Sequence, residues 1–320
     1  MTKAWGRAVL LGVSAAICGG ALAQSYPARP VRIVVTVAPG GGNDFLARLA
    51  GQKLGERLGQ QFIVDNRPGG GGTIATAQVA KAAPDGYTLL LGFVGPLAMT
   101  PHVEKVAYDP LRDFVGVSLL GSSYHMLAVH PSVPARSVKQ FIALAKARPG
   151  ELNYASANIW GPTHLVPELF KSVTGTNMMP LHYKGAGPAA IGVLSGEAQA
   201  IFAGVTAIMS YVRSQRLVAL ATTSPSRSPL IPELPTFKEL GYARVEAPSW
   251  YSIVAPAATP KDVIARLHGE LVKIAALPDY REQLERQGFE PQSTTPEQFA
   301  EFLKADYDKW GRVIRALKPQ

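Results

Sequence analysis

The sequence predicts an α/β protein made of two doubly wound lobes joined by hinge strands. Strand-like runs alternate with helix-like runs from residue 30 onward, and two glycine-rich turns each stand between a strand and a helix. A late strand at 250–256 follows the second series of alternating elements and returns the chain to the first lobe. The 320 residues are enough for two such domains.

The first series of elements builds the first lobe. Its helices are recognised by apolar residues at helical spacing, such as Leu46, Leu49 and Leu54, and Asp44 is expected to cap the first helix through its carboxylate. The predicted strands are 31–35, 62–64 and 87–92, and the predicted helices are 44–58 and 73–83. The predicted strands 115–120 and 126–129 then carry the chain out of this lobe.

The second series builds an inserted lobe before the chain returns. Its predicted strands are 152–155, 179–183, 198–203 and 218–222, and its predicted helices are 138–147, 162–174 and 188–194. After it, the predicted strand 250–256 returns to the first lobe, and the predicted helices 260–276, 278–287 and 296–317 finish the chain. We therefore expect a discontinuous first domain over 24–123 plus 248–320 and a second domain over 124–247. A small ligand is expected in the cleft between them, which hinge closure would bury.

The amino terminus has the pattern of a secretory signal peptide. Lys3 and Arg7 are the only charges before residue 24, an apolar stretch follows, and it ends in Ala21-Leu22-Ala23. We expect residues 1–23 to be removed after Ala23 and the mature chain to be exported. A retained membrane anchor and lipidation at Cys18, the only cysteine, stay open as alternatives. Without Cys18 the mature chain has no thiol chemistry.

Composition argues against several function classes. The net charge of +9 falls to +7 without the leader, and the basic residues are scattered, which disfavours nucleic acid. The six histidines show no metal-ligand spacing, and the common motifs of phosphate-binding loops, zinc proteases and serine hydrolases are missing. We expect no enzyme activity, no cofactor and no metal.

The two glycine-rich turns predict an anion site. One spans 39–44 and the other 66–73, each after a strand and before a helix. Glycine lets a ligand approach the main chain, and a helix start offers unpaired N–H groups. A dinucleotide-binding enzyme is an alternative, because Gly70 to Ala75 fits the pattern G-x-G-x-x-A. The acidic residue that such enzymes carry about 20 residues further on is missing.

These motifs, in this order, carry a family resemblance. The sequence strings are PGGGND at 39–44, NRPGGGG at 66–72, PDGYTLL at 84–90, YAS at 154–156, HL at 164–165, YKG at 183–185, LATTS at 220–224, PT at 235–236 and WY at 250–251. The chain resembles the substrate-binding proteins of tripartite tricarboxylate transporters, the Bug family, from Tyr26 to Lys318. The resemblance implies a type II periplasmic-binding-protein fold of the Venus-flytrap kind. It also implies a periplasmic monomer that captures a small carboxylate for membrane permease subunits.

The resemblance also implies the ligand contacts. In the first lobe they are Gly41, Gly42, Asp44, Gly70, Gly71 and Thr73, and in the second lobe Ser156, Thr163, His164, Gly185 and Ala186. His164 is equally suited to a structural hydrogen bond. The sequence does not decide whether the loaded protein serves a permease or a membrane sensor kinase.

Departures from the family pattern suggest which acid is bound. Phe93 follows the third strand, Ala157 to Trp160 replace small residues, and Ala203 stands where an aspartate is common. Another aspartate common in the family is replaced by Gly192. We add Phe93, Asn158, Trp160 and Ala203 to the predicted contacts, although Trp160 could simply pack between the lobes. These changes predict an acid with an apolar or aromatic body and no ammonium group.

Overall fold

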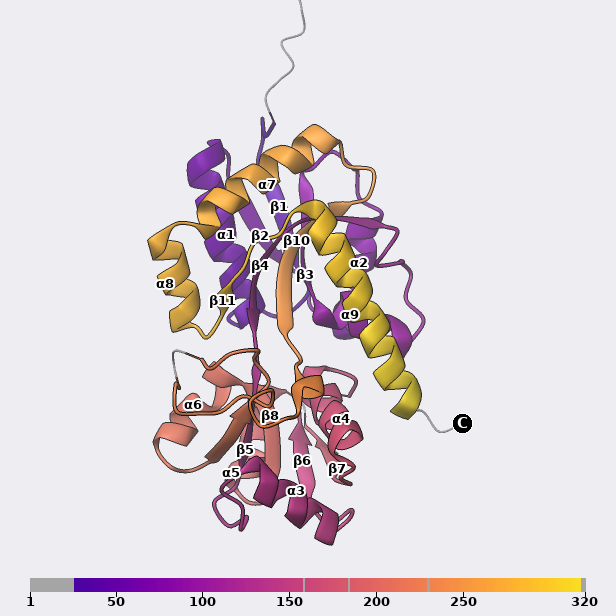
Figure 1. Ribbon diagram of the computed structural model, residues 1–320. Helices are drawn as coiled ribbons and strands as arrows, with labels where there is room; N and C mark the ends of the chain where they lie inside the picture. The colour runs from indigo at the N-terminus through magenta and orange to yellow at the C-terminus, as the bar shows by residue number, and fades with distance from the viewer. Residues whose placement is uncertain (1–25, 158, 184, 229–230, 318–320) are drawn as a thin grey trace, which may run out of the picture.

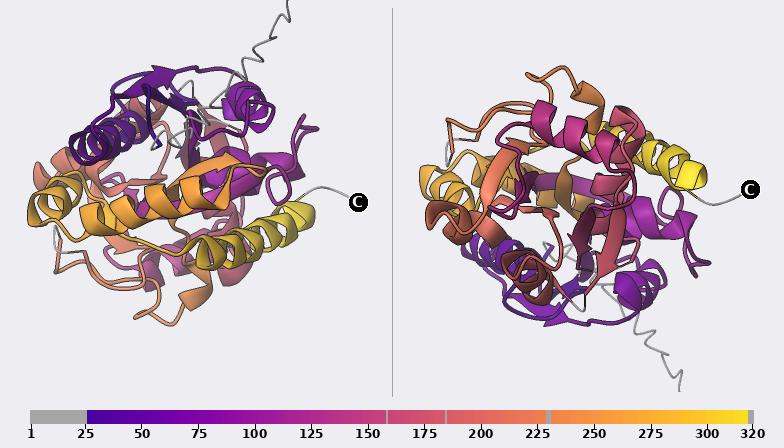
Figure 2. Two further views of the ribbon diagram at one scale, coloured as in Figure 1. Left: turned by 90° about the horizontal axis from the view of Figure 1, so that it is seen from above. Right: turned by 90° about the horizontal axis from the view of Figure 1, so that it is seen from below.

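The computed structural model describes residues 26–157, 159–183, 185–228 and 231–317, which form two lobes stacked along the long axis (Figure 1). The views from above and below present the first and the second lobe in turn (Figure 2). Each lobe is built around one sheet. The predicted doubly wound α/β architecture is confirmed.

The first sheet has the strand order β11-β4-β10-β3-β1-β2. Its strands are β1 (Val31–Val35), β2 (Phe62–Asn66), β3 (Thr88–Phe93), β4 (Phe114–Ser123), β10 (Ser249–Pro256) and β11 (Glu290–Pro291). The helices of this lobe are α1 (Gly42–Leu58), α2 (Thr73–Ala80), α7 (Lys261–Ala275), α8 (Pro278–Arg286) and α9 (Pro296–Leu317). Single helical turns η1 (Gly70–Gly72), η2 (Gly95–Met99) and η3 (Thr100–His102) complete it.

The second sheet has the strand order β7-β6-β8-β5-β9. Its strands are β5 (His125–Val129), β6 (Asn153–Ser156), β7 (Met179–His182), β8 (Ala200–Gly204) and β9 (Val218–Thr222). The helices are α3 (Val138–Ala147), α4 (Pro162–Thr174), α5 (Ala186–Leu194), α6 (Val205–Arg213) and the short turn η4 (Ala243–Val245). No helix in the described part of the chain is long and apolar enough to cross a membrane.

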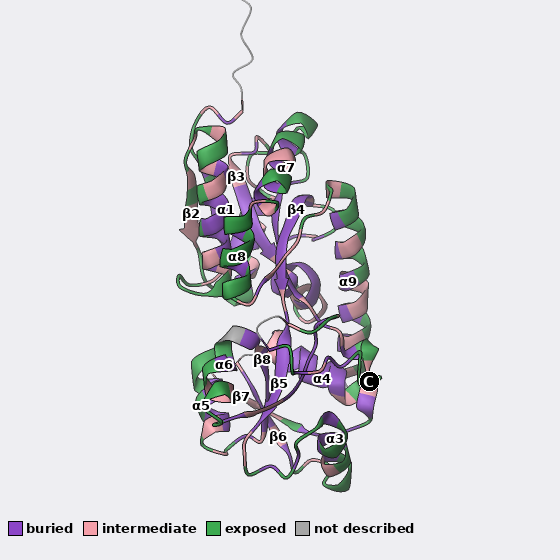
Figure 3. Ribbon diagram, turned by 60° about the vertical axis from the view of Figure 1, so that its left-hand side comes forward, coloured by how far each residue is buried: buried purple, intermediate pink, exposed green. Residues whose placement is uncertain are grey.

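Both faces of the first sheet are covered over most of β1, which explains why this strand is apolar at every position except the exposed Arg32. Val31, Ile33 and Val35 join one core cluster with residues of α1 and α7, while Val34 joins another with residues of α2 and α9. Alternate residues of a strand point to opposite faces, so a strand covered on both sides is apolar at nearly every position. Figure 3 shows the result as buried sheets beneath helices whose outer faces are exposed.

Two strands connect the lobes. β4 leads through Tyr124 directly into β5 of the second sheet, and β10 returns the chain beside β4 in antiparallel register from Ser249 to Pro256. We propose the domain boundaries 123/124 and 247/248, because strands of the first sheet lie within 31–123 and 249–291 and those of the second within 125–222. These two crossings are the natural hinge.

Strand directions bring the candidate loops together. β10 is antiparallel to β4, β3 is antiparallel to β10, and β1 and β2 run with β3, so all three run toward the second lobe as β4 does. In the second sheet β8 is antiparallel to β5, and β6 and β7 run with β8 toward the first lobe. The carboxyl ends of both parallel sets therefore face each other, where ligands of open α/β sheets bind.

Candidate ligand-binding site

A cavity of about 600 Å³ lies between the two lobes. The first lobe contributes the end of β1, the second glycine turn and the segment from β3 to η3, and the second lobe contributes the start of α4 and the loop before it. The lining residues are Thr36, Val37, Ala38, Pro68, Gly69, Gly70, Gly71, Gly72, Phe93, Gly95, Thr100, Val103, Glu104, Ile159, Trp160, Gly161 and Pro162.

The second glycine turn forms one wall and depends on glycine at every position. Gly69 to Gly72 have φ values of 137°, 54°, 61° and 95°, all in the region that side chains disfavour. The turn is closed by the Gly72 N–H, which donates to the Gly69 carbonyl at 2.9 Å, and by the Thr73 hydroxyl, which donates to the Gly70 carbonyl at 2.7 Å. The main chain of Gly70 and Gly71 is thereby left against the cavity.

Thr36 supplies a buried hydroxyl beside this turn. It lines the cavity, is 2% exposed, and its Oγ1 has no hydrogen-bond partner among the described residues. A buried polar atom without a partner costs about 1–3 kcal/mol, which a ligand or water in the cavity would recover. In the first glycine turn, which does not line the cavity, Asn43 Nδ2 and Asp44 Oδ1 likewise have no partner among the described residues. This end of the cavity is therefore suited to a polar ligand group.

The first glycine turn is organised by Asp44. Its Oδ2 accepts from the Gly40 N–H at 3.0 Å and from Arg48 Nε at 2.9 Å, and the Arg48 guanidinium holds the pKa of the Asp44 carboxyl down to about 2. The prediction that Asp44 caps the helix is wrong. α1 begins earlier, with Gly41 as its N-cap and no side-chain cap, because the Asp44 carboxylate is engaged by Gly40 and Arg48. Predicted contacts Gly41, Gly42 and Asp44 lie beside the cavity and do not line it.

The loop before α4 is held by two side chains of the first helical turn. The Ala157 N–H donates to Thr163 Oγ1 at 2.9 Å, and the Trp160 N–H donates to His164 Nδ1 at 3.1 Å. Burial lowers the pKa of His164 to about 4, so its imidazole is neutral at neutral pH and Nδ1 stays an acceptor. Thr163 and His164 therefore position Ile159 and Trp160, which line the cavity.

The remaining predicted contacts lie at the same edge of the second lobe, outside the cavity lining. Ser156 is buried at the end of β6, and Ala203 is buried on β8. Gly185 is the N-cap of α5, which begins at Ala186, and the Gly185 N–H donates to the Ala157 carbonyl at 2.9 Å. Asn158 lies outside the described residues. Of the predicted set, the structure brings Gly70, Gly71, Phe93 and Trp160 together in the cavity.

Several lining residues were missed in the sequence analysis. Thr36 carries a usable signal, because it is a polar residue at the end of an apolar strand and just before a glycine turn. Ile159 stands beside a predicted contact. Thr100, Val103 and Glu104 carry no signal, since their place depends on how the segment after β3 folds back.

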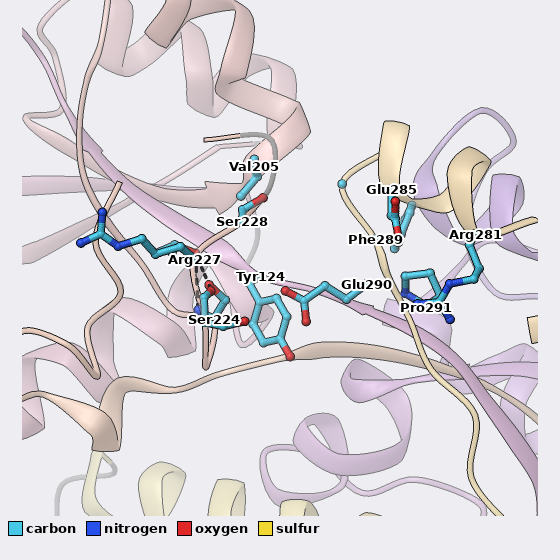
Figure 4. A pocket seen from close by; sticks show the side chains of 13 residues that line it. Tyr124, Val205, Ser224, Arg227, Ser228, Arg281, Glu285, Phe289, Glu290 and Pro291 are labelled. Carbon is cyan, nitrogen blue, oxygen red and sulfur yellow. Dashed lines mark hydrogen bonds between the residues drawn. The ribbon is translucent and has the colours of Figure 1, made fainter. Parts of the chain in front are cut away.

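A second cavity, of about 330 Å³, borders the hinge (Figure 4). Glu290 on β11 extends toward Tyr124 there, and β11 pairs with the hinge strand β4 through Glu290 and Ser122. Burial raises the pKa of the Glu290 carboxyl. The lining also holds Arg227, which forms an ion pair with Glu239, and none of the predicted contacts. Within the described ranges, no cluster of three or more His, Cys, Asp or Glu could hold a metal ion.

The sequence and the fold match a known family. The model of the tripartite tricarboxylate transporter family receptor covers residues 46–318. The chain belongs to this family. It is similar to Protein BugT of Bordetella pertussis, with 36% identity over 94% of this chain and 93% of that one. The receptor is thus a periplasmic solute-binding protein and not an enzyme, as predicted.

Solved structures support the same assignment. The structure of R. palustris Rpa4515 with adipate has a TM-score of 0.81 and 32% identity, covering 91% of this receptor and 97% of that chain. The periplasmic binding protein BugD has a TM-score of 0.77 and 31% identity, covering 91% and 98%. The predicted periplasmic-binding-protein fold of the receptor is confirmed.

Proposed function

We propose that this receptor captures a small carboxylate between its lobes and delivers it to the permease subunits of a tripartite tricarboxylate transporter. The observation that carries the proposal is the buried hydroxyl of Thr36, which has no hydrogen-bond partner among the described residues, in a cavity walled by the Gly69–Gly72 turn. A carboxylate accepts several hydrogen bonds at once, which suits closely spaced donors of this kind. The related Rpa4515, with adipate, gives an example of such a ligand in the family.

The expected affinity follows from the number of donors. Each hydrogen bond to a charged group contributes roughly 1.5–3 kcal/mol. The N–H groups of Gly70 and Gly71 and the hydroxyl of Thr36 together could therefore supply most of the about −8 kcal/mol of a micromolar complex. Lobe closure adds apolar contact and removes water. Bridging water would let the same turn accept acids of different length.

We also propose a role for the predicted contacts that do not line the cavity. Gly41, Gly42, Thr73, Ser156, Gly185, Ala186 and Ala203 lie at the two facing edges, where closure of the hinge would bring them nearer to a bound acid. Asp44, Thr163 and His164 act by holding loops in place. We also propose that residues 1–23 direct export and are removed after Ala23, and that the mature receptor acts as a monomer.

A thermal-shift screen of the mature chain tests the capture of carboxylates. The panel holds monocarboxylates, dicarboxylates, aromatic acids and, as controls, an amine, glucose and NAD. A ligand at 100 times its Kd should add about 2.7 kcal/mol of stability. Stabilisation by at least one acid and none of the controls is expected. A response to NAD with none to any acid would overturn the proposal and favour the dinucleotide alternative.

Delivery needs a separate test. Membrane vesicles that carry the permease subunits encoded beside this gene should take up the labelled acid only when the loaded receptor is added. Equal uptake without the receptor, or a neighbouring sensor kinase whose autophosphorylation responds to the loaded receptor, would contradict the assignment to transport.

A further inference from the structure

We infer that Trp160 is the specificity-determining residue of this receptor, and that it selects monocarboxylates with a flat apolar body over dicarboxylates. The inference rests on the proposed function, because it assigns the body of the acid captured there. It depends on how Trp160 is held, on the apolar walls around it, and on the charge of Glu104.

Trp160 is held in a strained backbone conformation. Its φ is 62°, in the left-handed region, and Gln215 is the other residue besides glycine with a positive φ in the described part of the chain. Such strain persists only where surrounding contacts determine it, and it concentrates at binding sites. Here the hydrogen bond from the Trp160 N–H to His164 Nδ1 and the tilted contact of their rings, with centroids 5.3 Å apart, fix the residue.

Trp160 lies between the hydrophobic core and the interlobe cavity. The half-buried side chain packs against the large core cluster of the molecule on one side and lines the cavity on the other. Next to it, Ile159 is 58% exposed although it is apolar. An exposed isoleucine beside a half-exposed indole ring forms an apolar surface that a ligand body would cover.

The opposite wall is apolar as well. Phe93 and Val103 of the first lobe line the same cavity, together with Val37 near the glycine turn. The cavity therefore combines a polar end, made by the Gly69–Gly72 turn and the Thr36 hydroxyl, with apolar walls from both lobes. This combination fits one carboxylate on an apolar, preferably aromatic, body.

Glu104 decides between one carboxylate and two. It is exposed and lines the same cavity. With one carboxylate held by the glycine turn and the Thr36 hydroxyl, as the proposed function has it, the second carboxylate of a diacid would enter the part of the cavity that contains the negative charge of Glu104. Like charges brought together in a partly desolvated site repel each other. An acid whose other end is neutral or apolar avoids this repulsion.

The main test compares three acids by titration calorimetry on the mature chain. Hexanoate and adipate have the same six-carbon chain and differ by one carboxylate, and phenylacetate supplies the aromatic body. We expect hexanoate and phenylacetate to bind at least about tenfold more tightly than adipate, the factor that corresponds to about 1.4 kcal/mol. Tighter binding of adipate than of hexanoate would overturn the inference and leave the capture of carboxylates intact.

Variants at position 160 test whether the Trp160 ring causes the preference for the aromatic acid. Trp160→Asn removes the ring and keeps a residue that tolerates positive φ. It should weaken phenylacetate binding at least about tenfold and adipate binding by less than about threefold, because only phenylacetate has an aromatic ring that contacts the indole. Gln215→Asn is the backbone control, because it also places asparagine at a positive-φ residue, here an exposed one outside the cavity lining, and it should change neither affinity. Equal losses for both acids in Trp160→Asn would contradict selection by the ring.

Two further variants keep the inference testable if Trp160→Asn folds poorly. Ile159→Ala, at an exposed position, should weaken phenylacetate about threefold or more, whereas Ile63→Ala, at a similarly exposed position on β2 outside the cavity lining, should not. Glu104→Gln should tighten adipate about threefold or more and hexanoate by less, so that the ratio of adipate to hexanoate affinity rises. No response of adipate to Glu104→Gln would contradict the role of its charge.

His164 is a positioning residue in this scheme. His164→Asn keeps an acceptor near the place of Nδ1, whereas His164→Phe removes it. The ratio of phenylacetate to adipate affinity should be kept in the first variant and collapse toward one in the second. A purely structural role would change stability in both and leave this ratio unchanged.

Discussion

The two glycine-rich turns of the first lobe are nearly alike in sequence but differ in what holds them. The second turn has four successive glycines with positive φ, lines the interlobe cavity and lies against the unpartnered Thr36 hydroxyl. In the first turn only Gly40 has a positive φ, while Gly41 has φ −90° and caps α1. In this first turn the Asp44 carboxylate accepts hydrogen bonds from the Gly40 N–H and from Arg48. One turn is shaped to leave its main chain against a cavity, and the other is closed on itself by a side chain.

The largest effect is expected for Gly72→Ala in the second turn. The new Cβ would lie 2.7 Å from Thr36 Oγ1, and the residue would keep a φ of 95°. Overpacking and backbone strain together should cost about 2–4 kcal/mol of unfolding free energy and abolish acid binding. Denaturant unfolding and calorimetry measure both. A stable variant with full affinity would show that the second turn is not the binding wall.

A smaller effect is expected for Asp44→Asn in the first turn. The pKa of the Asp44 carboxyl is lowered from 3.8 to about 2, so its charged form stabilises the fold above the unfolded pKa, and this contribution is lost as the pH falls from about 4 through about 2. The variant should lose about 1–2 kcal/mol at pH 7, and the difference from the parent should shrink toward pH 3. Ligand affinity should stay within about threefold. A large loss of affinity with unchanged stability would instead make Asp44 a direct contact.

Thr36→Val separates binding from folding. Valine has nearly the same shape and removes a hydroxyl that has no partner in the described structure, so the unfolding free energy should stay the same or rise by up to about 1 kcal/mol. Acid affinity should fall about tenfold because a donor to the carboxylate is lost. Unchanged affinity would mean that the hydroxyl does not donate to the bound acid.

The smallest effect is expected for Gly41→Ala. Its φ of −90° is open to alanine, and a Cβ there meets no atom within 4 Å. Stability should change by less than about 0.5 kcal/mol and affinity by less than about threefold. A loss of affinity as large as that of Gly72→Ala would put the ligand on both turns equally.

Sequence patterns predicted the lobes because each strand and helix is defined by its own apolar spacing. The strand at 31–35, the helix at 162–174 and the helix at 296–317 agree with β1, α4 and α9. Apolar spacing does not predict which partner a polar side chain binds, even among near neighbours. The sequence shows that Asp44 lies at the start of a helix, but not that Gly40 and Arg48 share its carboxylate. It likewise shows His164 near a helix start, but not that Nδ1 accepts from Trp160.

The candidate site was predicted in part for the same reason. A glycine-rich turn is visible in the local sequence, and Gly70 and Gly71 were therefore predicted correctly as residues of the cavity. Glu104 belongs to the site through the path of the chain after β3, which no local pattern specifies. Thr36 is marked by its position at a strand end, but only its burial without a partner reveals its role.

Amide NMR of the mature chain tests the central claim most directly. Adding an acid that stabilises the protein should shift the Gly70 and Gly71 amide resonances saturably and strongly, with smaller shifts at Gly40 and Gly41, because the carboxylate accepts hydrogen bonds from the second turn. Unmoved Gly70 and Gly71 resonances at saturation, with shifts centred on Tyr124 and Glu290 of the hinge cavity, would contradict it.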